Sequence, residues 1–182
     1  AVAAADLLSQ AEHDELASSV LLTPDEGFAK RVSQEVTAQL KQLSRGSIAV
    51  KAIRDYGLIA VTKDLAEAAE VANRFAPEHL ELLVKDPQRL LAGIRNAGAV
   101  FLGHCTPEAL GDYLAGPNHI LPTGGTARFS SPLGVYDFVK RISVLNFDGK
   151  ALAKYGNPAA AFAAMEGLDA HGKSILARLR PK

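Results

Sequence analysis

The sequence predicts an α/β domain with a mostly parallel sheet, followed by a helical arm. Two observations predict the domain: short apolar runs of strand length alternate with helix-like segments, and a capping residue precedes proline at several segment starts. A third observation, the change of composition near GGTARFSSPLG, predicts the arm. We expect the α/β domain at residues 1–128 and the arm at residues 129–182.

The first two predicted elements are helices. AVAAADLLSQ lacks the basic start of a signal peptide, so we interpret it as a helix. TPDEGFAKRVSQEVTAQLKQL has apolar residues every four positions, which predicts an amphipathic helix. Thr23 is its expected cap, and Glu26 completes a capping box three residues later.

Four short runs rich in Val, Ile and Leu are the predicted strands. Such runs are typical of parallel strands that are buried on both faces. They are SSVLLT, GLIAVT, HLELLV and AGAVFLG. Three further sites place a capping side chain before proline and predict helix starts: Asp86-Pro87, Thr106-Pro107 and Ser131-Pro132.

The arm begins with the short helix predicted from Ser131. A strand over RISVLNF follows, and then two helices in the alanine-rich NPAAAFAAMEGLDAHGKSILARL, broken near Gly167 to Asp169. A segment of this size buries little surface alone. We therefore expect it to pack on another domain or another subunit.

Composition excludes several classes of partner. Lys+Arg and Asp+Glu are equal at 20 each and no basic stripe occurs, which argues against nucleic acid. The apolar runs are too short to span a bilayer, which argues against a membrane. A single cysteine, Cys105, excludes an internal disulfide and favours a reducing compartment, so we expect a cytoplasmic protein. The chain begins without Met, and we expect it to be part of something larger.

Candidate metal ligands lie far apart in the sequence. Gln10 and His13 are three residues apart in the first predicted helix, so they share a face. Asp112 and His119 lie in or beside a loop dense in Gly and Pro, and His171 follows a predicted helix start. Each also has a plainer interpretation as a polar helix face, a structural turn or a solvated residue. Together, imidazole, carboxylate and amide oxygen form a ligand set typical of catalytic zinc.

A base that is not itself a ligand would complete such a site. Glu78 and His79 adjoin in RFAPEHLEL, and a histidine can take a proton from an alcohol or water near neutral pH. The plainer interpretation is a histidine at a helix C-terminus beside a surface carboxylate. A zinc hydrolase is a further possibility, but the sequence has no H-E-x-x-H motif.

Several motifs together resemble the C-terminal half of the histidinol dehydrogenase family. They are LLSQAEHD, PEHLEL, AGAVFLG, TPEALGDYLAGPNHILPTGGTARFSSPLGVYDFVKR and EGLDAHGKS, and they cover nearly the whole chain. The resemblance implies oxidation of L-histidinol through L-histidinal to L-histidine, with two NAD⁺ and one zinc ion per site. It also implies an incomplete Rossmann-like three-layer domain.

The resemblance implies a role for each candidate residue. Gln10, His13, Asp112 and His171 match zinc ligands, and Glu78 and His79 match the catalytic pair. His79 would accept the alcohol proton, and Glu78 would help to activate the attacking water. The substrate contacts it implies are Gln10, His13, His79, Asp112, His119, Glu166 and His171.

The resemblance also implies a homodimer in which the arms are exchanged, so that Glu166 and His171 complete the partner's site. The family's chain is more than twice as long, and its N-terminal half, which carries most NAD⁺ contacts, has no counterpart here. The alternative is a truncated, non-catalytic module that binds zinc and imidazole ligands or only dimerises.

Overall fold

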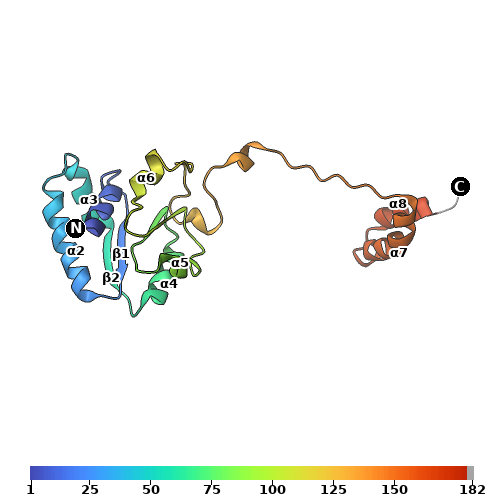
Figure 1. Cartoon of the computed structure of the whole chain (residues 1–182). Coiled ribbons are helices and arrows are strands. Elements are labelled where there is room, and N and C mark those ends of the chain that lie inside the picture. Colours follow the sequence, from blue (N-terminus) through green and yellow to red (C-terminus); the bar gives the residue numbers. More distant parts are fainter. Residues whose placement is uncertain (180–182) are drawn as a thin grey trace. The chain divides into compact units, whose positions relative to one another are not determined.

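A computed structural model describes residues 1–179 of the chain (Figure 1). The chain divides into two compact units, Ala1–Phe138 and Val139–Lys182. The division falls later than the boundary expected at residue 128. No helix among the described residues is long and apolar enough to cross a membrane.

The first unit alternates helices and short strands, which confirms the predicted α/β class. All four predicted strands form, and each is shorter than its apolar run. The elements are α1 (Val2–Ala11), β1 (Ser19–Thr23), α2 (Glu26–Leu40), α3 (Gly46–Tyr56), β2 (Gly57–Val61), α4 (Leu65–Phe75), β3 (His79–Leu82), α5 (Pro87–Leu91), β4 (Ala99–Leu102), α6 (Glu108–Tyr113), and the 3-10 turns Thr126–Arg128 and Val135–Phe138.

The strands form two parallel pairs instead of one continuous sheet. β1 pairs with β2 in the register Ser19 to Gly57, and β3 pairs with β4 in the register His79 to Ala99. Parallel pairing of strands joined through helices is what the alternating pattern predicts.

Two of the expected caps differ from the structure. Asp25 caps α2, because its Oδ1 accepts from the Phe28 N–H at 2.8 Å, whereas Thr23 ends β1 and accepts from the Asp25 N–H. Thr106 donates to the Leu102 carbonyl at the end of β4 instead of capping α6. Asp86 does cap α5, through the Arg89 N–H. At the start of α2, the Asp25 carboxylate takes the place of Thr23 as cap because a carboxylate is the better acceptor.

The main core holds α1 against α2 over the first strand pair. Its buried members are small or branched, which lets the helices approach closely. They are Ala3, Ala4, Leu8, Val32 and Val36, with Leu21 and Ile59 packed against them. This contact fixes α1, the helix whose last turn carries Gln10.

The second unit is a helical hairpin of α7 (Gly149–Met165) and α8 (Asp169–Leu179). The break falls where it was predicted, at Gly167, whose φ of +70° favours glycine. The strand predicted over RISVLNF is wrong, because the segment finds no pairing edge among the described residues and its side chains are exposed. No helix starts at Ser131 either; a 3-10 turn follows at Val135–Phe138.

Candidate active site

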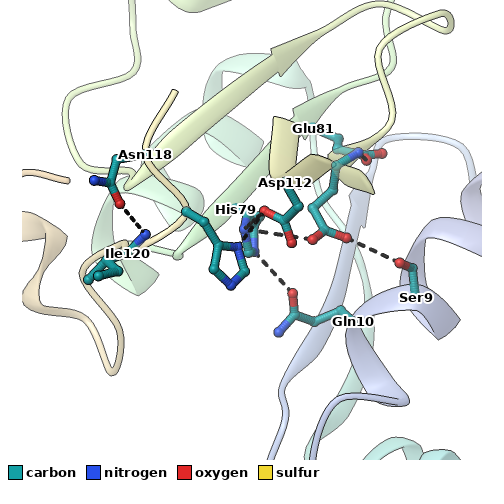
Figure 2. Close-up of polar contacts among 9 residues, drawn as sticks. Ser9, Gln10, His79, Glu81, Asp112, Asn118 and Ile120 are labelled. Carbon is teal, nitrogen blue, oxygen red and sulfur yellow. Dashed lines mark hydrogen bonds and ion pairs between the residues drawn. The ribbon is translucent and has the colours of Figure 1, made fainter. Parts of the chain in front are cut away.

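His79 and Gln10 form the centre of the candidate site (Figure 2). His79 opens β3, and its Nδ1 lies 3.2 Å from the Gln10 Oε1 at the end of α1. An amide oxygen only accepts, so with the Gln10 amide oriented to present Oε1 to the ring, Nδ1 is assigned as the donor and Nε2 carries the lone pair.

The other ring nitrogen of His79 is buried and has no hydrogen-bond partner among the described residues. It lies 3.8 Å from the Glu108 Oε1 and 3.9 Å from the Asp112 Oδ1, too far for hydrogen bonds. Burial lowers the pKa of His79, although the nearby Glu78 and Asp112 carboxylates oppose that shift. The ring is therefore a neutral base with a free lone pair at neutral pH.

Two carboxylates from α6 face His79. The side chains of Glu108 and Asp112 are each only 8% exposed, and they are one helical turn apart. Burial raises the pKa of Glu108, as does the neighbouring Asp112, while a hydrogen bond from Ser9 Oγ at 3.1 Å opposes the rise. Burial also acts to raise the pKa of Asp112, but hydrogen bonds to His119 and Glu108 outweigh it and lower the pKa.

His119 approaches Asp112 from the loop that follows α6. Its Nδ1 lies 3.0 Å from the Asp112 Oδ1, and the hydrogen bond to that carboxylate raises the pKa of His119. The ring is otherwise exposed, with 67% of the side chain in solvent. The loop is shaped by an Asx turn in which Asn118 Oδ1 accepts from the Ile120 N–H at 2.7 Å.

A donor set for a cation lies beside His79. Ligand atoms of His13, Glu108 and Asp112 lie within 4.8 Å of one another. His13 lies just beyond α1, so the expectation that Gln10 and His13 share one continuous helix is corrected; the His13 N–H still bonds the Gln10 carbonyl at 3.4 Å. Nitrogen and carboxylate donors without thiolate suit a borderline metal such as zinc.

The carboxyl group of Glu81 supports the start of α6, and the carboxyl group of Asp6 lies next to it. Glu81 Oε1 accepts the N–H of Glu108, the first residue of α6, at 2.9 Å. Burial raises the pKa of Glu81 to about 7. Burial also raises the pKa of the adjacent Asp6, against a hydrogen bond with Glu81 that lowers it. β3 therefore provides both the His79 ring and the side chain that holds α6.

Four of the predicted site residues form two contacting pairs in the structure, and a fifth, His13, lies beside them. Gln10 contacts His79, and Asp112 contacts His119; His13 shares the donor set with Asp112. Glu78 precedes β3 and lines a groove next to His79. Glu166 and His171 lie in the second unit. Glu166 is the C-cap residue of α7, and His171 lies in the first turn of α8.

Ser9, Glu81 and Glu108 were missed by reasoning from the sequence. The signal for Glu108 was present, since it lies four residues before Asp112 on a helix and therefore on the same face. Glu81 could have been found because it is charged within an apolar strand, two residues after His79 and so on the same side of β3. Ser9 offered no such signal.

Comparisons with known proteins identify similar chains over almost the whole length. The sequence profile described as histidinol dehydrogenase matches residues 1–179. The histidinol dehydrogenase of Geobacter sulfurreducens is 59% identical over 177 residues, and that of Bacillus subtilis is 53% identical over 177 residues. These alignments cover 97% of this chain but only 41% and 42% of the relatives, so the chain spans about 41% of the Geobacter relative's length.

A solved structure is similar over the same extent. The crystal structure of histidinol dehydrogenase from Elizabethkingia anophelis superposes with a TM-score of 0.91 at 38% identity. The superposition covers 97% of this chain and 40% of that one.

Proposed function

Because the chain belongs to the histidinol dehydrogenase family, we propose that its site serves the oxidation of L-histidinol through L-histidinal to L-histidine. The family acts in histidine biosynthesis, and we propose a cytoplasmic, zinc- and NAD⁺-dependent reaction. The observation that carries the proposal is the buried His79 Nε2, which has a lone pair, finds no hydrogen-bond partner within residues 1–179, and faces two carboxylates.

The proposed zinc ligands are Gln10, His13, Asp112 and His171. Their donors fit the ion, since His13 and Asp112 already lie within one 4.8 Å group and offer nitrogen and oxygen. Bound zinc would supply a Lewis acid that holds the imidazole and amine of the substrate. Glu108 is a buried carboxylate of the same group and would balance the charge of the ion.

His79 is the proposed proton acceptor. Its lowered pKa keeps Nε2 unprotonated at neutral pH, and the Gln10 amide holds the ring in the orientation that presents Nε2. The substrate hydroxyl would give its proton to Nε2 while its carbon gives a hydride to NAD⁺. Glu78, next to the base, would help a water molecule to attack the aldehyde in the second oxidation. His119, held in place by its hydrogen bond to Asp112, would contact the substrate from the exposed side of the site.

The second unit is proposed to complete the site of a partner chain. Glu166 and His171 would reach the other protomer in a homodimer with exchanged arms. The large apolar side chains that α7 and its approach expose support this proposal, because two short helices do not bury them. They include Val144, Leu145, Phe162 and Met165.

A reconstituted assay tests the proposal. The part of the Geobacter sulfurreducens relative that this chain does not span is expressed separately and mixed with it. NADH formation from L-histidinol and NAD⁺, lost on chelation and restored by Zn²⁺, is the expected result. Zinc-dependent histidinol binding without turnover would instead favour a non-catalytic module, and absence of both would contradict the proposal.

A further inference from the structure

Phe101 is a buried ring in β4 that contacts both the base and the helix that carries the two carboxylates. It is only 7% exposed. Its ring centroid lies 5.9 Å from that of His79, and the two ring planes are tilted by 46°. This distance is usual for a pair of packed rings. The Phe101 side chain has no polar group, so it can act in the site only through the groups that it contacts.

The register of the second strand pair explains why these side chains meet. Glu81 pairs with Phe101, and His79 precedes Glu81 by two residues, so the three side chains point to the same face of the β3–β4 pair. α6 covers that face at two points. The Glu108 N–H donates to Glu81 at the start of the helix, and Gly111 lies on the Phe101 ring.

The Phe101 ring limits how closely α6 approaches the sheet. A Cβ built on Gly111 would lie 2.6 Å from Cε1 of the ring and 3.0 Å from Cζ, so the helix backbone already rests against the ring edge. Protein interiors are close-packed, and a gap opened at such a contact is filled in part by movement of the surrounding structure. The length of the Phe101 side chain therefore sets the distance between the sheet and α6.

That distance decides whether His79 can receive a substrate. Its Nε2 lies 3.8 Å from the Glu108 Oε1 and 3.9 Å from the Asp112 Oδ1, and both carboxyl groups belong to α6 (Figure 2). Hydrogen bonds end at about 3.2 Å, so a movement of α6 toward the sheet by about 0.7 Å would bring both oxygens within range. A carboxylate at that distance would occupy the position that the substrate hydroxyl needs.

We propose that Phe101 is a positioning residue, a spacer that holds the two α6 carboxylates just beyond hydrogen-bond range of His79 and so leaves Nε2 open to the substrate hydroxyl. Phe101 acts through the Gly111 backbone and the His79 ring, and not on the substrate itself. The inference rests on the proposed function, in which His79 is the base. The spacing is a property of the fold and is measured without turnover.

Two complementary substitutions test the spacer. Phe101→Leu shortens the side chain, and Gly111→Ala adds the Cβ that the ring excludes. In crystals of the reconstituted assembly treated with chelator, Phe101→Leu should bring Nε2 of His79 within about 3.2 Å of a carboxylate oxygen of α6. Gly111→Ala alone should lengthen the distance between these atoms. The double variant should return it to about 3.8 Å.

Turnover should follow that distance. At saturating Zn²⁺ and L-histidinol, kcat of Phe101→Leu should fall by at least about tenfold, because a general base contributes about 10²- to 10⁴-fold and is here partly blocked. The double variant should recover to within about threefold of the unmodified assembly. An unchanged Nε2 distance in a folded Phe101→Leu assembly, or a double variant no more active than Phe101→Leu, would overturn the proposal. Absence of turnover in the unmodified assembly would contradict the proposed function instead, and the distances would still decide on the spacer.

Phe28→Leu is the matched control, because it makes the same substitution where α2 packs on the main core. It should lower the unfolding temperature and leave the distances from Nε2 of His79 unchanged. If Phe101→Leu does not fold, Gly111→Ala and the double variant carry the test. Equal Nε2 distances in these two variants would also overturn the proposal.

Discussion

The Nδ1 of His79 lies 3.2 Å from the Gln10 Oε1, and this contact joins the start of β3 to the end of α1. It sets which nitrogen of the ring carries the proton. As a result, Nε2 keeps a lone pair, in a buried position beside Glu108 and Asp112. One side chain on a neighbouring helix therefore prepares the base.

Replacing Gln10 tests that relationship. In Gln10→Leu the acceptor is lost, so His79 should populate both neutral tautomers instead of mainly the Nδ1–H form. Long-range ¹H–¹⁵N correlations of the ring report the tautomer directly. Gln42→Leu, at an exposed position, is the control and should leave the ring unchanged. An Nε2–H tautomer in the unmodified chain would contradict the assignment.

Glu81 predicts a pH dependence of folding stability. Its folded pKa of about 7 exceeds the ordinary value of 4.5, so the folded state binds more protons between these values. The contribution of Glu81 to stability is therefore complete below about pH 4.5 and is lost as the pH rises through 7. In urea unfolding at about pH 8, the free energy of unfolding of Glu81→Gln should exceed that of the unmodified chain by on the order of 1 kcal/mol. The Gln side chain keeps the acceptor for the Glu108 N–H.

The control for that measurement is Glu70→Gln on the exposed face of α4, which should show no such gain. His79 acts in the opposite direction: its folded pKa is lowered, so protonation in the unfolded state costs stability as the pH falls below 6.5. A free energy difference between Glu81→Gln and the unmodified chain that does not change with pH would show that folding does not shift the pKa of Glu81.

Gly111 allows α6 to approach β4. A Cβ at this position would lie 2.6 Å from the Cε1 of Phe101, a buried ring, so Gly111→Ala should displace α6 together with Glu108 and Asp112. We expect zinc affinity, measured by calorimetry, to fall by about 10- to 100-fold, as when the support of a ligand is disturbed. Gly149→Ala, where a Cβ meets nothing within 4 Å, should leave the affinity unchanged. Equal zinc affinities of Gly111→Ala and Gly149→Ala would show that the position of α6 does not affect zinc binding.

Mixing two inactive variants tests the exchanged arm. His79→Ala and His171→Ala each damage a different half of a composite site, so a mixed dimer should hold one intact site and one with both lesions. Random exchange of chains in the reconstituted assay should restore activity at about a quarter of the sites. No recovery in an assembly that exchanges subunits would place both residues of a site in one chain.

Local patterns predict the elements better than they predict the site. The runs at β1 to β4 could be identified because apolar composition and punctuation are local properties. The strand expected at residues 141–147 failed because pairing requires an edge that the sequence does not display. Ser9 was missed for a similar reason: its contact with Glu108 joins residues 99 positions apart. Asp112 and His119, which the structure brings within 3.0 Å of each other, could be singled out because a loop dense in Gly and Pro marks their position.

The most direct test of the account is the turnover number of His79→Asn in the reconstituted assay with L-histidinol and NAD⁺. Asn can still donate to Gln10 but cannot accept the alcohol proton at the Nε2 position. We predict that kcat falls by about 10²- to 10⁴-fold with zinc affinity retained. A His79→Asn enzyme that turns over within about twofold of the unmodified one would contradict the assignment of His79 as the base.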